Sequence, residues 1–294
     1  MIRIREYAVA LVLACAGIAA APAQSFAASA LDCPASAEFV RLSKPLARFS
    51  ARLLHNEDIT ILALGSSSTE GTGASRPEFN YPNQLASELR RMLPRARVKV
   101  LNRGVGGEDV RQMLPRLNRY LASEKPDLVL WQVGTNALLA EKGVDAQAPL
   151  ILDGVRKIRA GGVDVILMNP QYAPYVLRDP DARPMVKLLA KVADETGVPV
   201  FHRFELMQYW HEAREVAFSD FLAPDLFHMN DWSYGCLARN LAAALVASAN
   251  ANPEDAPAAA SASTVDSAAP ATAQPAPTPS APASAPVTSV SALR

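Results

Sequence analysis

The chain has 294 residues, enough for one large domain or two small ones. Lysine plus arginine and aspartate plus glutamate both number 29, so the formal net charge is zero. This balance gives no electrostatic reason to expect nucleic acid or an anionic membrane surface as a partner. Apolar residues make up 50% of the chain, which allows a sizeable core.

Residues 1–30 have the pattern of a secretory signal peptide. Arg3 and Arg5 precede a stretch of apolar and small residues, and sites suited to signal peptidase follow at residues 21–23 and 28–30. The apolar stretch is short for a membrane span, so we expect no integral membrane segment after cleavage. The mature protein is therefore predicted to be periplasmic or secreted. The alternative is a lipoprotein acylated at Cys15, which the short apolar stretch before that residue disfavours.

Cleavage would leave two cysteines, Cys33 and Cys236. Cysteines in an exported protein can pair, so we predict a disulfide that joins the N-terminal segment to the last helix. The alternative is two free buried thiols.

Residues 31–250 are predicted to form the folded domain, in which apolar runs of strand length alternate with stretches of helical periodicity. The expected strands are residues 59–64, 98–102, 128–133, 163–168 and 198–201. The expected helices are residues 81–93, 109–123, 149–160, 182–196 and 231–248, with Pro115 able to kink the second. Residues 251–294 are rich in Ala, Pro, Ser and Thr and contain no aromatic residue, which predicts a disordered tail.

Alternating strands and helices predict an α/β fold, a three-layer α/β/α sandwich with a five-stranded parallel sheet of the flavodoxin-like kind. Functional loops of such sheets lie beyond the carboxyl ends of the strands. In this chain those loops are residues 65–73, 103–109, 134–138 and 169–175. Polar residues and glycines are concentrated there.

Ser67 is the candidate nucleophile, on a turn between an apolar strand and a helix whose N–H groups face a developing oxyanion. The competing interpretation is a helix N-cap, a position that serine often occupies. The sequence Ser66-Ser67-Ser68 does not by itself decide which hydroxyl points inward.

Two further loops carry residues suited to an oxyanion. Asn136 ends the run Gly134-Thr135-Asn136 and offers an amide N–H, although a turn residue would look the same. The run 103–107 contains glycines that permit close approach of backbone N–H groups. A nucleotide-binding loop is the rival interpretation, but neither glycine-rich run continues as G-x-G-x-x-G and no P-loop motif occurs.

Asp225 lies three residues before His228, one of only four histidines. A carboxylate at this distance can orient a histidine that acts as a general base. A surface Asp-x-x-His pair is the alternative. A zinc site is not expected, because the chain has neither H-E-x-x-H nor a close Cys/His cluster.

Between residues 59 and 246 these pieces occur in an order that resembles the SGNH (GDSL-type) hydrolase family. The family's Gly-Asp-Ser block resembles Gly65-Ser66-Ser67, and its Asn-and-glycine block resembles residues 102–107. Its Gly-x-Asn-Asp block resembles residues 134–137, and its Asp-x-x-His block resembles residues 225–228. The resemblance implies a Ser67, Asp225 and His228 triad. It also implies an oxyanion hole from Ser67, Gly107 (or Gly106, one residue away) and Asn136.

Ser66 and Ala137 depart from the family, which usually has Asp at both positions. An α/β-hydrolase is the nearest rival, but it requires Gly-x-Ser-x-Gly and usually places its acid and its histidine on separate loops.

The resemblance implies ester hydrolysis through an acyl-enzyme, without metal or organic cofactor. A small-molecule or glycan ester is the expected substrate, short acyl esters of carbohydrates first. Lysophospholipase, thioesterase or acyltransferase activity and a silent module that binds acylated glycan are the alternatives. Four residues near the predicted site could form the substrate pocket, although they could equally be ordinary packing residues: Tyr172, Tyr175, Met229 and Trp232.

Overall fold

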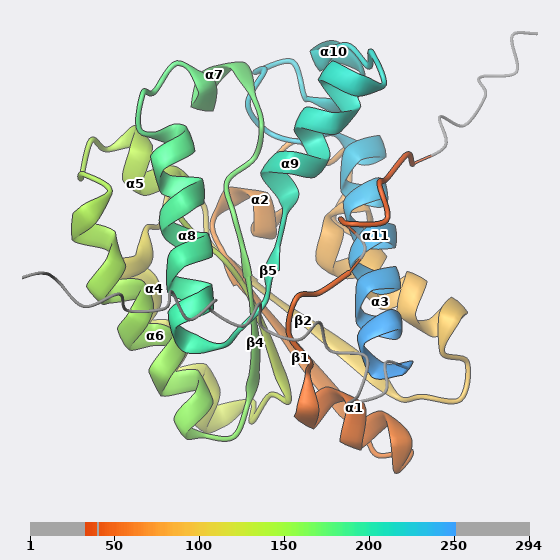
Figure 1. Cartoon of the computed structure of the whole chain (residues 1–294). Coiled ribbons are helices and arrows are strands. Elements are labelled where there is room, and N and C mark those ends of the chain that lie inside the picture. Colours follow the sequence, from red (N-terminus) through yellow and green to blue (C-terminus); the bar gives the residue numbers. More distant parts are fainter. Residues whose placement is uncertain (1–32, 40, 251–294) are drawn as a thin grey trace, which may run out of the picture. The chain divides into compact units, whose positions relative to one another are not determined.

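The computed structural model describes residues 33–39 and 41–250, which Figure 1 shows in colour. The expected leader, residues 1–30, and the expected tail, residues 251–294, lie outside the described residues. None of the helices in the described part is both long and apolar enough to cross a membrane.

The predicted parallel sheet is confirmed, and its strand order is β2-β1-β3-β4-β5. Every neighbouring pair is parallel. This is the flavodoxin-like order expected for a doubly wound sheet. The strands are β1 (Ile59–Gly65), β2 (Val98–Gly104), β3 (Leu128–Gln132), β4 (Asp164–Met168) and β5 (Val200–Phe201).

Burial along the strands explains why the sequence reads as apolar runs. Every residue of β3 is buried, and so is nearly all of β1, because helices cover both faces of the central strands. The edge strand β2 is only partly buried and carries polar residues. The other edge strand, β5, has two residues and follows Pro199, which has no N–H to donate to a sheet.

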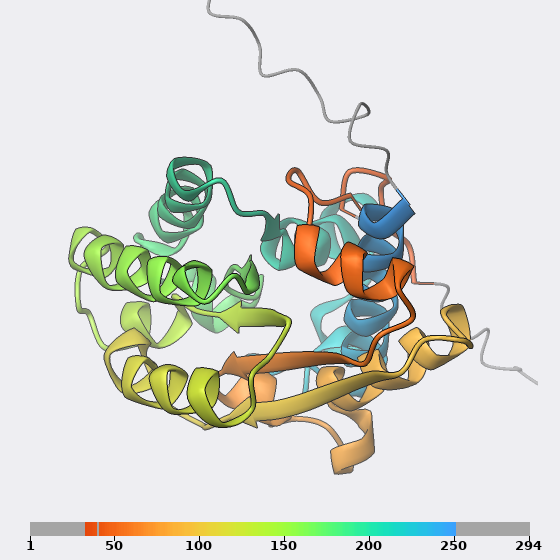
Figure 2. The same cartoon turned by 90° about the horizontal axis from the view of Figure 1, so that it is seen from below.

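Helices cover the two faces of the sheet (Figures 1 and 2). One group is α1 (Ala47–Leu54), α3 (Tyr81–Met92) and α11 (Asp231–Asn250), and the other is α4 (Val110–Ser123), α6 (Ala148–Ala160) and α8 (Ala182–Thr196). The Asn80 side chain caps α3, and a reciprocal capping box between Asp109 and Gln112 begins α4. Helix α4 continues through Pro115 to its end.

Several short elements were not expected from the sequence. They contain three to eight residues, too few to show a helical period. Besides α1, they are α2 (Ser67–Glu70), η1 (Pro77–Phe79), α5 (Thr135–Leu139), η2 (Asp145–Gln147), α7 (Pro174–Leu177), α9 (Arg203–Gln208), the π-helix η3 (Tyr209–Ala213) and α10 (Phe218–Phe221). Helices α2, α5 and α7 follow the carboxyl ends of strands and so lie where functional loops were expected.

The predicted disulfide is present and joins Cys33 to Cys236 in α11. It fastens the N-terminal segment to a helix whose cysteine is fully buried. The Trp210 indole N–H donates to the Pro34 carbonyl at 2.8 Å and holds the same segment. The two disulfide-bonded cysteines are 203 residues apart in the sequence.

Replacing both Cys33 and Cys236 with alanine is expected to lower the free energy of unfolding by about 2–5 kcal/mol, because the disulfide restricts the unfolded chain. Denaturant unfolding of the wild-type protein and the double variant, with and without a reducing agent, measures this. The reducing agent should destabilise the wild type and leave the variant unchanged. Equal stabilities in the absence of reducing agent would contradict the expectation.

Candidate active site

The candidate site lies at the carboxyl edge of the sheet, where the strand order reverses between β1 and β3. Parallel α/β sheets bind ligands at such a switch point. Ser67 follows β1 and Asn136 follows β3, so pairing of these strands brings the two residues to one edge.

Ser67 is the first residue of α2, and only 9% of it is exposed. The helix N-cap is Ser66, whose side chain makes no capping hydrogen bond. The Ser66 hydroxyl and backbone N–H both donate to the Gln132 amide oxygen on β3, at 3.0 and 2.9 Å. The turn therefore directs the two neighbouring hydroxyls differently, Ser66 into the protein and Ser67 toward His228.

His228 lies on the loop before α11, where the Asp225 carboxylate shapes a tight turn. One Asp225 oxygen accepts the backbone N–H groups of Phe227 and His228, each at 2.9 Å. Leu226, which lies between Asp225 and Phe227, adopts φ +53°, a left-handed conformation that is uncommon for residues other than glycine. The turn folds Asp225 back toward the His228 ring.

The three side chains form one continuous line of hydrogen bonds. His228 Nδ1 lies 2.6 Å from Asp225 Oδ2, and His228 Nε2 lies 2.8 Å from Ser67 Oγ. An ionised carboxylate can only accept, so Nδ1 carries the proton and Nε2 is left as an acceptor. Ser67 then donates its hydroxyl proton to Nε2, the orientation that a general base requires.

The charge of Asp225 is stabilised in place. Burial alone would raise its pKa, but hydrogen bonds from the His228 ring and from the backbone N–H groups of His228 and Phe227 lower the pKa of this carboxyl below its usual value. Asp225 therefore stays ionised at and above mildly acidic pH, so that its negative charge is available to the imidazole of His228.

Distant parts of the chain meet here through backbone contacts. Gly73 has φ +91°, and a Cβ there would lie 2.3 Å from the Met229 carbonyl oxygen and 3.1 Å from His228 Cβ. The Asp231 carboxylate accepts from the Ser75 backbone N–H at 2.7 Å and from its hydroxyl at 2.6 Å. The segment after α2 is thus held directly against the His228 loop.

The glycine loop after β2 passes close to Ser67. A Cβ on Gly106 would lie 3.9 Å from Ser67 Cβ, and Gly104 leaves no room for a Cβ against the backbone of α2. Gly107 has open space around it but adopts φ +78°, which is the reason glycine suits that position. Asn136 Nδ2 donates to the Glu108 carbonyl at 2.8 Å, and its second amide hydrogen is left for another acceptor.

Ion pairs hold the glycine loop in position. Glu108 pairs with Arg116, and Asp109 pairs with Lys142, which follows the Asn136 helix α5. The Asp109 side chain is 3% exposed. Burial alone would raise the pKa of Asp109, but hydrogen bonds from Lys142 and from the backbone of α4 lower it. The Asp109–Lys142 pair thus joins the loop of Gly107 to the element of Asn136.

We expect Lys142→Met to lower kcat by about 10-fold with little change in KM, because slightly displaced donors weaken transition-state binding more than substrate binding. Lys142→Arg keeps the charge and should recover most of the loss. Steady-state kinetics on p-nitrophenyl acetate measures both variants. A kcat for Lys142→Met equal to that of the wild type would refute the positioning role of the pair.

Three of the four expected pocket residues are buried or partly buried. Met229 is fully buried, and Tyr172 is buried with its hydroxyl donating to Glu212 at 2.6 Å. Burial, with Glu212, raises the pKa of Tyr172 to about 12. Trp232 packs edge-on against Trp210, with ring centroids 5.1 Å apart. Of the four, Tyr175 is the exposed side chain, with 51% of it accessible.

Sequence reasoning missed two glutamines under the site. Gln132 takes three hydrogen bonds from the serine turn, the third from Thr69 at 3.3 Å. The Gln171 amide oxygen accepts from Thr135 and from the buried Arg203, each at 3.0 Å. The available signal was a polar residue at the end of a buried strand, for Gln132, or within the loop after one, for Gln171, because buried polar groups need partners.

The two departures from the family pattern have local explanations. Ser66 is held by the neutral Gln132 amide, so the turn needs no carboxylate there. Ala137 is buried at 2% exposure and packs in the core. Within the described part of the chain, no group of three or more His, Cys, Asp or Glu side chains is placed to hold a metal ion.

Comparison with protein families gives a match over residues 32–251, which include all the described residues, to the model of the non-GDSL lipase-like family. The chain belongs to this family. Ser66 in place of the usual Asp agrees with the family's name. None of the curated proteins matches the sequence.

Solved structures show the same fold at low identity. A two-domain esterase (CEX) active on acetylated mannans superimposes with TM-score 0.61 and 19% identity, over 73% of this chain and 58% of that one. This chain thus spans little more than half the length of that esterase. The acetyl xylan esterase AlAXEase gives TM-score 0.53 and 18% identity, over 62% of this chain and 97% of that one. The lipase/acylhydrolase from Enterococcus faecalis gives TM-score 0.52 and 23% identity, over 63% of this chain and 93% of that one.

The resemblance to SGNH hydrolases is therefore confirmed in fold and family. The matched family is described as lipase-like, and the solved structures of the same fold include esterases and a lipase/acylhydrolase.

Proposed function

We propose that this family member is an exported serine esterase that cleaves carboxylic esters through Ser67, His228 and Asp225. The observation that carries the proposal is the unbroken line of hydrogen bonds from Ser67 Oγ to His228 and on to Asp225, at 2.8 and 2.6 Å. A helix N-cap or a surface Asp-x-x-His pair would not require these three groups to meet across 161 residues of sequence.

Ser67 Oγ attacks the ester carbonyl carbon while His228 Nε2 takes the hydroxyl proton. The tetrahedral intermediate collapses, the bond to the alcohol oxygen breaks, and the alcohol leaves with the proton from His228. Water then attacks the acyl-enzyme and gives a proton to His228. The second collapse returns that proton to Ser67 and releases the carboxylic acid.

Asp225 holds the imidazole in the required tautomer and stabilises the imidazolium formed in each step. The proposed oxyanion donors are the backbone N–H groups of Ser67 and Gly107 and the Asn136 amide. The bond from Asn136 to the Glu108 carbonyl supports this role, because it fixes the amide beside the glycine loop.

The proposed substrates are short acyl esters, in particular acetyl esters, of carbohydrates. The same fold in esterases whose names refer to acetylated mannans and acetyl xylan supports this class. Export is supported by the Cys33–Cys236 disulfide, since such bonds persist in oxidising compartments. The leader 1–30 and the tail 251–294 remain part of this proposal.

Longer acyl esters are the second candidate, as in a lysophospholipase or thioesterase. The observation that favours them is the exposure of apolar side chains on two loops of the site, Leu226 at 44% and Val105 at 40%. Such side chains can contact an acyl chain.

Hydrolysis of p-nitrophenyl esters of increasing chain length separates the candidates. We expect the highest kcat/KM at acetate, with a steady decline beyond four carbons. A maximum at eight or more carbons would favour the second candidate. No turnover of any ester by folded protein would reject the esterase proposal and favour a silent binding module.

A further inference from the structure

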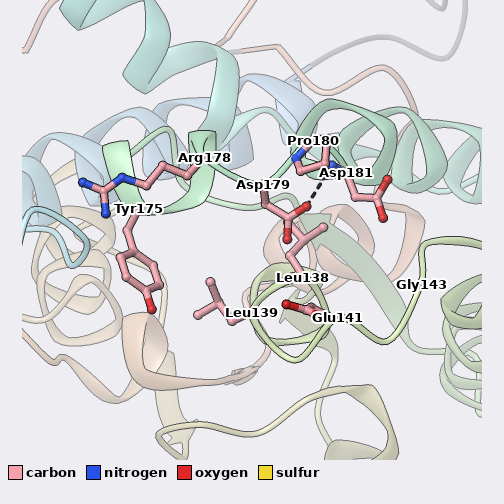
Figure 3. Close-up of a pocket in the computed structure, with 9 residues that line it drawn as sticks. All are labelled: Leu138, Leu139, Glu141, Gly143, Tyr175, Arg178, Asp179, Pro180 and Asp181. Carbon is pink, nitrogen blue, oxygen red and sulfur yellow. Dashed lines mark hydrogen bonds between the residues drawn. The ribbon is translucent and has the colours of Figure 1, made fainter.

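A hollow of about 610 Å³ lies beside the candidate active site (Figure 3). One wall is the end of α5 and the loop after it, and the other is α7 with the segment leading to α8. The lining residues are Leu138, Leu139, Glu141, Gly143, Tyr175, Arg178, Asp179, Pro180 and Asp181. Its size falls within the range of pockets that bind small organic ligands, roughly 300–1,000 Å³.

Two connections join the hollow to the catalytic groups. Helix α5 carries Asn136 in its first turn and Leu138 and Leu139 at its end. On the opposite wall the Tyr175 ring lies 5.3 Å from the Phe227 ring, which lies 4.4 Å from the His228 ring. Helix α5 thus links the hollow to Asn136, and two successive ring contacts link it to His228.

The charged side chains of the lining exclude two kinds of ligand. Three carboxylates, those of Glu141, Asp179 and Asp181, line the hollow together with a single guanidinium, that of Arg178. Within the described residues, no ion pair involves any of these four groups. A long acyl chain would cover and desolvate them, which is costly. An anionic headgroup would meet an excess of negative charge.

The same lining suits a neutral ligand with many hydroxyl groups. Carboxylate oxygens accept hydrogen bonds from hydroxyls, and the guanidinium donates to hydroxyl and ring oxygens. Tyr175, half exposed, and Leu139, at 36% exposure, offer apolar surface for the C–H face of a ring. Figure 3 shows Tyr175 and Arg178 toward one side of the hollow and Asp179 and Asp181 toward the other.

We propose that this hollow binds the sugar rings of a neutral oligosaccharide ester, as the subsite for the alcohol part of the substrate. This inference rests on the proposed esterase function for its role in catalysis. Binding of the sugar itself is independent of catalysis, which allows a separate test.

The first test compares two acetyl esters, mono-O-acetylated xylotetraose and p-nitrophenyl acetate, which share the acyl group and differ in the alcohol. We expect Tyr175→Ala to lower the ratio of their kcat/KM values about 10-fold, as loss of one good pocket contact does. Tyr175→Phe keeps the ring and should keep most of the ratio. An unchanged ratio for Tyr175→Ala would overturn the proposal.

A matched control comes from a second hollow remote from the site, lined in part by Arg156, Arg159 and Glu195. Glu195→Gln should leave the ratio unchanged, whereas Asp181→Asn should lower it several-fold. Equal effects of these two variants would overturn the proposal. So would a Tyr175→Ala variant that loses p-nitrophenyl decanoate hydrolysis relative to acetate, because the hollow would then hold the acyl chain.

The second test is calorimetric titration of unacetylated xylotetraose into wild-type protein and Tyr175→Ala. We expect binding by the wild type that weakens about 10-fold in the variant. Binding without hydrolysis of any ester would reject the esterase proposal alone. Ester hydrolysis without wild-type binding of xylotetraose would reject the sugar subsite alone.

Discussion

Ser67→Ala is expected to lower kcat for p-nitrophenyl acetate by on the order of 10⁴–10⁶-fold, because it removes the only atom proposed to form the acyl-enzyme. The variant should fold normally, since the Ser67 hydroxyl is bonded to His228 and not to the helix backbone. Initial rates at saturating substrate, with circular dichroism of both proteins, measure the effect.

Ser68→Ala is the matched control, because Ser68 is the next residue of the same helix and equally small. It should retain activity within a few-fold. If Ser67→Ala kept activity close to wild type, or if Ser68→Ala showed the large loss, Ser67 would not be the nucleophile.

Asp225→Asn is expected to lower kcat by about 10⁴-fold, because a neutral amide no longer fixes the proton on His228 Nδ1 or stabilises the imidazolium. KM should change little, since this carboxyl is proposed to act through His228. Asp225→Glu can still supply a charge and should lie between wild type and Asp225→Asn. Rates within 10-fold of wild type for Asp225→Asn would contradict the proposed role.

The same substitution carries a stability signature. The pKa of folded Asp225 lies below its unfolded value of 3.8, so the unfolded state binds more protons as pH falls through that region. Asp225 therefore stabilises the fold above about pH 4, and the contribution disappears at lower pH. The stability difference between wild type and Asp225→Asn should shrink on acidification, which urea unfolding at several pH values measures.

The sheet and its functional edge could be predicted because the local pattern is strong. Residues 59–64 and 128–133 are mostly apolar runs, and both become central strands buried on two faces. Once the strands are parallel, their carboxyl ends share an edge, and the pairing of β1 with β3 makes the loops bearing Ser67 and Asn136 neighbours.

Side-chain directions could not be predicted in the same way. Ser66, Ser67 and Ser68 are chemically equal in the sequence, and their directions depend on Gln132 and His228, which lie far away in the chain. Met229 looks like a pocket residue by position, yet its backbone pairs with Leu222 in an isolated antiparallel bridge and its side chain enters the core. Contacts made only after folding decide both cases.

The helices α5 and α7 also escaped sequence analysis, and with them the hollow beside the site. They contain five and four residues, so neither gives a periodic signal. Tyr175 was expected near the substrate, but the sequence analysis assigned no role to the charged residues Arg178, Asp179 and Asp181.

The central claim is that His228 activates Ser67 as a nucleophile. The most direct measurement is intact-protein and peptide mass spectrometry after treatment of the wild-type protein with a fluorophosphonate. The account predicts a single phosphonyl adduct on Ser67, which is lost in His228→Ala. No adduct, or an adduct on a serine other than Ser67, would contradict it.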